Sequence, residues 1–232
     1  MALFDLDNTL IAGDCDTEWL AFMVTHGLID QPTHDRLSDW FETEYAAGTI
    51  DLQTFSQTVL APLSDVEAHE ITAWRDRFLE ERIAPLVLPD AEALIDDHRR
   101  AGDRTVLVTA TSTFIANPVA ERLGVDSVLA TPVAFGPDRP SGPLATTACF
   151  RRGKIDHVEA YCQELGASPA SLSTWAERAT FYSDSHNDLA LLRWVGRPVA
   201  VDPDPHLAAE AQKHGWPIMS LRSRSARSQS VP

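Results

Sequence analysis

The chain has 232 residues, of which 44% are hydrophobic and 23% are charged, as expected for a soluble globular protein with a sizeable core. The formal net charge of -15 opposes binding to nucleic acid or to an anionic membrane surface. No apolar run approaches the roughly 18 residues that a membrane-spanning helix requires. From the charge we expect no nucleic acid as a partner, and from the charge and the short apolar runs we expect no membrane.

The first predicted element is a buried strand, formed by the apolar run in the segment ALFDLD at residues 2–7. Because this run belongs to a strand and lacks the basic start and cleavage site of a secretory signal peptide, we expect a cytoplasmic protein. Cys15, Cys149 and Cys162 agree with that compartment, since an odd number of cysteines without CxxC spacing is typical of free thiols.

A helical insertion is predicted at residues 15–83. This stretch contains no run typical of a strand, but it contains several amphipathic patterns, one of which starts at Ser64 with Glu67 in capping-box spacing. We therefore expect a small helical cap inserted into a larger domain. The aromatic residues expected to form its core are Trp19, Trp40, Phe41, Tyr45, Phe55, Trp74 and Phe78.

Strands and helices alternate in most of the remaining chain. Further strands are predicted in RTVLVTA, DSVLAT, ATFYSD and RPVAVD, and a helix is predicted in GKIDHVEAYCQELG, where Gly166 can end it in a left-handed conformation. Because every parallel crossover needs a covering helix, this alternation predicts an α/β fold with a doubly wound parallel sheet. Residues 1–14 and 84–222 would form this core.

Two segments have the composition of irregular structure. AFGPDRPSGPLA, which lies between Val133 and Thr146, combines Gly with Pro and indicates a hairpin or a surface loop. Residues 223–232 are polar and repetitive, and a disordered tail is expected there.

Acidic residues follow two of the predicted strands, at the edge where ligands bind in open α/β sheets. Asp5 and Asp7 come after the first strand and Asp184 after the strand in ATFYSD, while Asp188 lies one helical turn further along. Four carboxylates that converge would repel one another unless a cation neutralised them. Oxygen ligands with little sulfur or imidazole nearby favour a hard ion, so Mg²⁺ is the expected cofactor.

A hydroxyl and a lysine at the same edge indicate that the ligand is a phosphate. Thr109 ends the strand in RTVLVTA, and Lys154 opens the predicted helix. Mg²⁺ and Lys154 would offset the charge of phosphoryl oxygens, while Thr109 and the backbone amides of residues 6–9 would donate hydrogen bonds to them. One carboxylate could then attack phosphorus while a second, two residues away on the same side of the strand end, moves the proton.

The order of these residues resembles that of the haloacid dehalogenase-like hydrolases. DLDNT is similar to the DxDxT signature of that family, and Thr109 in VLVTA is similar to its second motif. Lys154 resembles the third motif, and Asp184 with Asp188 in YSDSHNDLALL resembles the fourth. The likeness covers residues 2 to about 221, and a helical insertion between the first and second motifs resembles the branch that contains phosphoserine phosphatases.

By this resemblance, Asp5 would form an aspartyl-phosphate and Asp7 would be the general acid and base. Asp5, the carbonyl group of Asp7, and Asp184 would hold Mg²⁺. Asp188 would complete the metal site, and Asn187 would support both the metal and the phosphate. The resemblance thus implies a Mg²⁺-dependent phosphomonoesterase that acts on a small phosphate ester.

The resemblance also suggests which residues recognise the rest of the substrate. Asp14 lies where phosphoserine phosphatases place the acid that receives the substrate amine, and Asp16 and Glu18 are close enough to join the same negative patch. His186 lies inside the fourth motif and could touch the substrate. Plainer roles stay open, since Asp14 or Asp16 could cap the first insertion helix and His186 could be an exposed loop histidine.

The chain departs from phosphoserine phosphatases at two motifs and in the insertion. Their Gly pair after the second-motif hydroxyl is replaced by Ala110 and Thr111, and their GDGxND appears as SDSHND. WFETEYAAGTIDL lacks the arginine that would hold a substrate carboxylate, whereas PVAVDPDPHLAAEAQKHGWPI resembles bacterial members of the branch associated with histidinol phosphate. An amine-bearing phosphate such as histidinol phosphate is therefore favoured, with phosphoserine next.

Other interpretations fit the pattern less well. An EF-hand calcium loop needs Gly at Leu10 and Glu at Asp16, and a receiver domain places all its acids before the Thr and Lys. Taken singly, Lys154 could be a solvated lysine and Thr109 an ordinary strand end. A phosphotransferase or mutase, and a phosphate-binding module with negligible turnover, are the alternatives to a phosphatase. The sequence does not indicate the oligomeric state.

Overall fold

The structure is a computed structural model, and it describes residues 1–47, 50–63, 66–133 and 147–222. Two expected features fall outside these ranges: the segment AFGPDRPSGPLA and the tail at residues 223–232. Ser64 also lies outside them, but the prediction that it opens a helix is wrong, because that helix begins at Ala68 with Glu67 as its N-cap residue.

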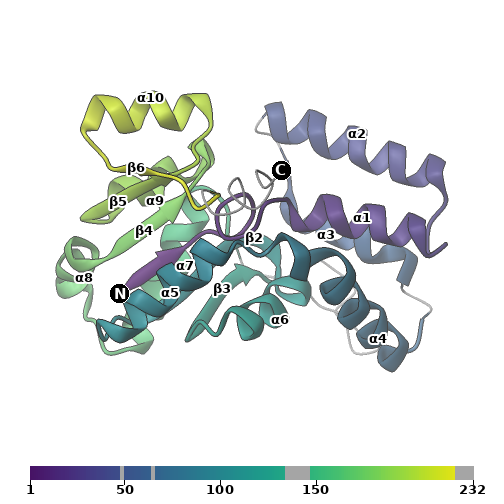
Figure 1. Cartoon of the computed structure of the whole chain (residues 1–232), viewed down its shortest axis with the longest axis horizontal. Helices are drawn as coiled ribbons and strands as arrows, with labels where there is room; N and C mark the ends of the chain where they lie inside the picture. Colours follow the sequence, from purple (N-terminus) through teal and green to yellow (C-terminus); the bar gives the residue numbers. More distant parts are fainter. Residues whose placement is uncertain (48–49, 64–65, 134–146, 223–232) are drawn as a thin grey trace, which may run out of the picture.

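A six-stranded sheet forms the centre of the molecule (Figure 1). Its strands are β1 (Ala2–Phe4), β2 (Thr105–Ser112), β3 (Ser127–Thr131), β4 (Thr180–Ser183), β5 (Arg197–Val201) and β6 (Ile218–Met219). All neighbouring strands are parallel, in the order β3-β2-β1-β4-β5-β6. The predicted doubly wound α/β fold and its five predicted strands are confirmed, and β6 is an additional strand at one edge.

Helices separate the strands along the chain. They are α1 (Cys15–Thr25), α2 (Gln31–Ala47), α3 (Leu52–Leu60), α4 (Ala68–Phe78), α5 (Pro89–Arg100), α6 (Thr113–Leu123), α7 (Arg152–Glu164), α8 (Leu172–Arg178), α9 (Leu189–Trp194) and α10 (Pro205–His214). The helix predicted in GKIDHVEAYCQELG is α7, and Gly166 follows it with a φ of +99°, as expected for a left-handed helix end.

The central strand β1 is apolar throughout because its two faces pack into two different cores. Ala2 and Phe4 belong to one cluster of buried side chains, and Leu3 belongs to the other. The first core contains side chains of α5 and α6, and the second contains side chains of α7, α9 and α10. Helices therefore cover both faces of the sheet.

The first four helices lie together beside the sheet (Figure 1, right). Trp19, Phe55 and Phe78 are fully buried there, and their cluster is continuous with the core under β1. Trp40 and Phe41 are partly buried and pack against the same cluster. Trp74 is also partly buried against it, whereas the side chain of Tyr45 lies outside the described part.

The chain enters and leaves this helical group along two adjacent segments. Ile11 and Val87 form an antiparallel bridge, and the N–H group of Ala12 donates to the carbonyl oxygen of Leu86 at 2.8 Å. Within the described residues between these two segments, the elements are helical, as predicted.

The state of the cysteines and the lack of a membrane-spanning helix were also predicted from the sequence. Cys15, Cys149 and Cys162 are buried and free, which confirms the prediction of free thiols. In the described ranges, every helix is too short or too polar to cross a bilayer.

Candidate active site

The central pocket lies where the direction of the sheet connections reverses. β1 and β4 are neighbours, but the chain continues from β1 to β2 on one side and from β4 to β5 on the other. Such a reversal leaves a crevice beyond the carboxyl ends of the strands. A cavity of about 360 Å³ lies there, and it is lined by Asp5, Asp7, Lys154, Asp184 and Asp188. The structure therefore brings these predicted residues together.

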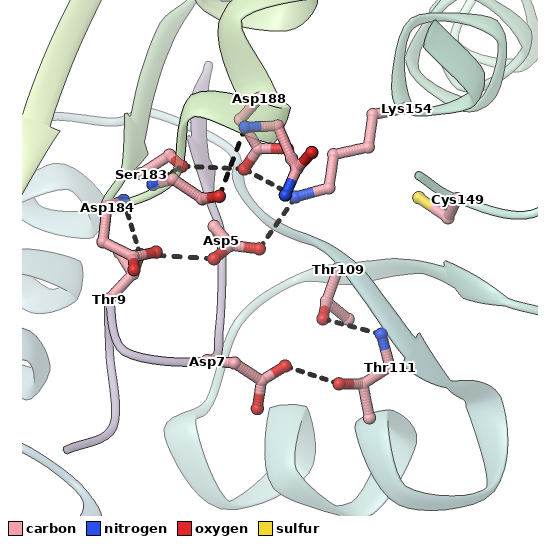
Figure 2. Close-up of polar contacts among 12 residues, drawn as sticks. Asp5, Asp7, Thr9, Thr109, Thr111, Cys149, Lys154, Ser183, Asp184 and Asp188 are labelled. Carbon is pink, nitrogen blue, oxygen red and sulfur yellow. Dashed lines mark hydrogen bonds and ion pairs between the residues drawn. The ribbon is translucent and has the colours of Figure 1, made fainter. Parts of the chain in front are cut away.

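Asp5 and Asp184 meet at the hydroxyl group of Thr9 (Figure 2). Thr9 Oγ1 lies 3.3 Å from Asp5 Oδ2 and 3.1 Å from Asp184 Oδ1, and the N–H group of Asp184 donates to Thr9 Oγ1 at 3.1 Å. Burial raises the pKa of Asp5 to about 6, although Lys154 opposes this effect. Burial and repulsion from Asp5 raise the pKa of Asp184 to about 8. Two neighbouring acids that resist ionisation together favour a bound cation.

Lys154 supplies positive charge to the same site. Its Nζ lies 2.8 Å from Asp5 Oδ1 and 2.7 Å from Asp188 Oδ2, and only 3% of its side chain is exposed. The hydroxyl group of Ser183 donates to Asp188 Oδ2 at 2.7 Å. Burial alone would lower the pKa of Lys154, but Asp188 and Asp5 outweigh burial and hold this pKa above its ordinary value. Lys154 is thus a buried cation and not a solvated helix-start lysine.

Asp7 is held by one donor from the insertion and one from the sheet. The backbone N–H of Cys15, at the start of α1, donates to Asp7 Oδ1 at 2.7 Å. The hydroxyl group of Thr111 donates to Asp7 Oδ2 at 2.5 Å (Figure 2). Burial, with repulsion from Asp14 and Asp5, raises the pKa of Asp7 to about 7. A carboxyl group with a pKa near neutral pH can both give and take a proton.

Thr109 and Asn187, which were predicted together with Lys154 to bind phosphate, differ in their contact with the cavity. Thr109 is fully buried outside the cavity lining, and its Oγ1 accepts a hydrogen bond from the N–H of Thr111 at 3.1 Å. Asn187 lines the cavity, and its Oδ1 accepts a hydrogen bond from Arg151 Nε at 3.0 Å. Asn187 Nδ2 is buried without a hydrogen-bond partner among the described residues. A buried donor of this kind suits an anionic ligand such as a phosphoryl oxygen.

The acids at the start of the insertion are divided between the cavity and the surface. Asp14 lines the cavity and also caps α1, because its Oδ1 accepts a hydrogen bond from the N–H of Thr17 at 2.8 Å. Asp16 lines the cavity as well. Glu18 lies outside the cavity lining, with its Oε2 at 3.6 Å from Arg82 Nη1. The structure therefore brings Asp14 and Asp16 to the site but does not bring Glu18 there.

The remaining cavity wall combines imidazole with apolar side chains. His186 lines the cavity, and its Nδ1 lies 2.8 Å from Asp204 Oδ2. Phe41 of α2 and Leu52 of α3 add apolar surface from the insertion, and Phe150 adds it from the segment before α7. The cavity therefore offers acidic groups and apolar surface to the part of a ligand beyond the carboxylates.

The carboxylates fit a hard ion that is held by few protein ligands. Considering the described residues alone, no three Asp, Glu, His or Cys side chains are arranged around one ion position. Asp5 and Asp184 are the pair that converges at the Thr9 hydroxyl. Both contacts of Asp188, from Lys154 and Ser183, go to its Oδ2. Mg²⁺ is commonly bound through one or two carboxylates, with water and substrate phosphate completing its shell. This pair therefore fits Mg²⁺ better than it fits an ion that needs a complete protein cage.

Three residues with specific contacts at the site were not predicted from the sequence. The first is Thr9, which ends the DLDNT segment. The second is Thr111, which lies two residues after Thr109, so the alternation of side chains along a strand could have indicated that Thr111 faces the same side of the sheet as Thr109. Arg151 contacts Asn187 from a turn in which its own φ is +50°, a left-handed conformation that favours glycine. The sequence carries no signal for that conformation.

Comparisons with known proteins identify the family of this chain. Residues 2–193 match the family of haloacid dehalogenase-like hydrolases. A histidinol-phosphatase of Neisseria meningitidis serogroup C (strain 8013) is 35% identical over 223 residues, which cover 96% of this chain and 99% of that protein. A phosphoserine phosphatase of Mycobacterium tuberculosis (strain ATCC 25618 / H37Rv) is 28% identical, with 100% of this chain and 74% of that protein covered.

Solved structures have the same fold. A protein from Bordetella pertussis Tohama I is 33% identical and superimposes with a TM-score of 0.85, covering 95% of this chain and 98% of its own. A phospho-aspartyl intermediate analogue of phosphoserine phosphatase has a TM-score of 0.62 at 16% identity, with 95% and 92% coverage, and this likeness concerns the fold alone. Because the family match and a 35% identical relative both span most of its length, this chain belongs to the haloacid dehalogenase-like hydrolases.

Proposed function

We propose that this protein is a Mg²⁺-dependent phosphomonoesterase that works through a phosphorylated Asp5. The observation that carries the proposal is the position of Asp5 between the ammonium group of Lys154 and the carboxylate of Asp184, which shares the Thr9 hydroxyl with it. A nucleophilic carboxylate beside a cation and a metal-binding carboxylate is suited to attack on a phosphate ester. The relatives named as phosphatases support this reaction class.

Asp5, Asp184 and the backbone carbonyl of Asp7 would hold the ion. Asp188 would complete the metal site and would also fix Lys154. When bound, Mg²⁺ would neutralise negative charge on the phosphoryl oxygens and on Asp5. Asn187 Nδ2, for which the described part of the chain supplies no partner, supports a phosphate position next to this pair, since a phosphoryl oxygen would satisfy it.

In the first half-reaction, an oxygen of Asp5 forms a bond to phosphorus while the bond from phosphorus to the ester oxygen breaks. Asp7 gives its proton to that leaving oxygen. In the second half-reaction, water attacks phosphorus, Asp7 takes the proton of that water, and the bond between Asp5 and phosphorus breaks to release inorganic phosphate. The ammonium group of Lys154 and the amide of Asn187 would bind the other phosphoryl oxygens, with the backbone amides of residues 6 and 7 as further donors. The other expected donors are not included, because Thr109 lies outside the cavity lining and the N–H groups of Asn8 and Thr9 donate to backbone carbonyls of their own loop.

The proposed substrate is an amine-bearing phosphate, with histidinol phosphate favoured over phosphoserine. Asp14 and Asp16 line the cavity wall, and burial with repulsion from Asp14 raises the pKa of Asp16, an effect that an ammonium or imidazolium group of the substrate would relieve. Phe41 gives the wall an aromatic surface. Among the described residues, no arginine lines the cavity to pair with a substrate carboxylate. The name of the 35% identical relative, histidinol-phosphatase, supports the same choice.

The proposed domain division follows the path of the chain. Residues 1–14 and 84–222 would form the catalytic core, and residues 15–83 would form a cap over the substrate. The paired crossing segments at Ile11 and Val87 support this division. The buried free cysteines suit a reducing environment, so we include a cytoplasmic location in the proposal.

Phosphate release from a panel of esters tests this function. The protein is incubated with Mg²⁺ and histidinol phosphate, phosphoserine, phosphocholine or a sugar phosphate, without an added acceptor alcohol. We expect Mg²⁺-dependent release that is fastest with histidinol phosphate, and free phosphate without an acceptor argues against a phosphotransferase. Asp5→Asn should abolish turnover while leaving the circular dichroism spectrum unchanged. No release from any ester, or near-normal release by Asp5→Asn, contradicts the proposal.

A further inference from the structure

We propose that Thr111 is a positioning residue, which orients the carboxyl group of Asp7 for proton transfer to the leaving group. This inference rests on the proposed function and adds to it a residue outside the motif positions assigned above. Thr111 Oγ1 lies 2.5 Å from Asp7 Oδ2, and the two residues are separated by 104 positions in the sequence. The contact therefore depends on the packed fold and not on a local turn.

The two hydrogen bonds of Asp7 approach different oxygens of its carboxyl group. Cys15 N–H donates to Oδ1 from the start of α1. The Thr111 hydroxyl donates to Oδ2 from the end of β2, as Figure 2 shows. One hydrogen bond would leave the carboxyl group free to rotate about its last torsion angle, whereas two on different oxygens define its plane. The hydrogen bond from Thr111 is thus the contact from the sheet that keeps the carboxyl group of Asp7 from rotating.

Thr111 is itself well fixed. Its residue is 2% exposed, it lies on β2, and its backbone N–H donates to the hydroxyl oxygen of Thr109 at 3.1 Å. A hydroxyl group can donate to a carboxylate and accept from a carboxylic acid. The contact can therefore persist when Asp7 is an acid in the first half-reaction and when it is a base in the second.

Loss of the hydroxyl should have an effect that depends on the leaving group. An alkoxide leaves only when it receives a proton from Asp7, whereas 4-nitrophenolate is stable enough to leave without one. In Thr111→Val, we expect the rate of Asp5 phosphorylation by an alkyl phosphate to fall about tenfold to hundredfold. The rate of the 4-nitrophenol burst from 4-nitrophenyl phosphate should change by less than about threefold.

Two variants serve as controls. Thr111→Ser keeps the hydroxyl group and should restore most of the rate with the alkyl phosphate. Thr105→Val makes the same replacement at the other end of β2, where Thr105 is also fully buried and its hydroxyl also contacts a carboxylate, Asp126 Oδ2, at 3.0 Å. Thr105→Val should leave the rates with both substrates unchanged.

The outcomes separate this inference from the proposed function. If the unmodified protein hydrolyses no phosphate ester, the proposed function fails and this inference fails with it. If the unmodified protein hydrolyses both esters but Thr111→Val lowers the rate of Asp5 phosphorylation equally for the two esters, or for neither, only the role of Thr111 is overturned. Should Thr111→Val not fold, Thr111→Ala removes the same hydroxyl with a smaller side chain and should show the same dependence on the leaving group.

Discussion

Lys154 is the cation on which two buried carboxylates depend. Its Nζ lies within 2.8 Å of Asp5 and 2.7 Å of Asp188, and the side chains of Lys154 and Asp188 are each 3% exposed. Attraction between such close charges offsets the cost of removing them from water, but only while all three are present. The cluster therefore positions Asp5 and also determines the stability of the fold.

Lys154→Met should lower the free energy of unfolding by about 3 kcal/mol, because it leaves buried carboxylates without their counter-charge. It should also abolish phosphate release. Urea unfolding measures the first effect, with Lys213→Met as a matched control. Lys213 pairs with Glu210 on an exposed helix surface, and its replacement should have little effect. Equal stability of the two variants would contradict the role given to Lys154.

The acids and the lysine of the site were predictable because they occur in motif order at strand ends. Asp5, Lys154, Asp184 and Asp188 all line the cavity, as that placement implies. Their hydrogen-bond partners were not predictable in the same way. The contact between Thr111 and Asp7 joins segments far apart in the chain, and its existence depends on the register between β1 and β2.

The start of α7 is the element that places Lys154, and it depends on a close backbone contact. A Cβ atom at Gly153 would lie 2.1 Å from the carbonyl oxygen of Ala148, so no larger residue fits without movement of the chain. Residues 150–153 form a turn in which the N–H of Gly153 donates to the carbonyl oxygen of Phe150 at 2.8 Å. Displacement of this turn would move Lys154 away from Asp5.

Gly153→Ala should therefore reduce kcat more than tenfold in protein that remains folded, since small shifts of catalytic groups have large effects on rate. Gly196→Ala is the matched control. A Cβ atom there would lie 2.1 Å from the carbonyl oxygen of Glu177, the same clearance, but Gly196 precedes β5 and is remote from the carboxyl ends of the strands. Gly196→Ala should lose stability without losing kcat. Unaltered kcat in folded Gly153→Ala would contradict this account.

Helix α1 begins at Cys15 and is capped by Asp14, which combines this structural role with a position in the cavity wall. Asp14→Ala should lower the free energy of unfolding by about 1 kcal/mol because the cap is lost. Asp14→Ser keeps a capping oxygen and should retain most of that stability. Both variants should lose about tenfold in preference for an amine-bearing over a neutral phosphate, measured as a ratio of kcat/KM values. Unchanged selectivity would assign Asp14 to the helix cap alone.

The whole sheet determines where the site lies, and this feature was predictable from the sequence. Five apolar segments predicted the five longer strands, and the helical insertion between β1 and β2 was expected from residues 15–83. The sixth strand, Ile218–Met219, has only two residues, which is too short for a period to be recognised. The position of Glu18 outside the cavity lining was not predictable either, because sequence spacing does not determine which face of α1 meets the cavity.

Stability of the metal-free protein should decrease as the pH rises from about 5 to about 8. Burial raises the pKa of Asp5 to about 6, of Asp7 to about 7 and of Asp184 to about 8, above the ordinary value near 4. Acids with raised pKa values stabilise the fold while they stay neutral, and this stabilisation is lost as the pH rises through the raised values. The direction is opposite to that of an ordinary paired carboxylate.

Mg²⁺ should reverse this loss, because it binds the ionised carboxylates of the folded state. We expect the increase in the thermal unfolding midpoint on adding Mg²⁺ to be larger at about pH 8 than at about pH 5. Asp184→Asn should weaken both the pH dependence and the response to Mg²⁺. An increase that is the same at both pH values would contradict a site made of raised-pKa carboxylates.

The most direct test of the account is the identification of the phosphorylated residue during turnover. The protein is mixed with substrate and Mg²⁺, quenched with acid, digested and analysed by mass spectrometry. The account predicts a phosphoryl group on Asp5 in the N-terminal peptide, and none on that peptide from Asp5→Asn. A phosphoryl group on a different residue, or continued release of phosphate without any phosphorylated Asp5, would contradict it.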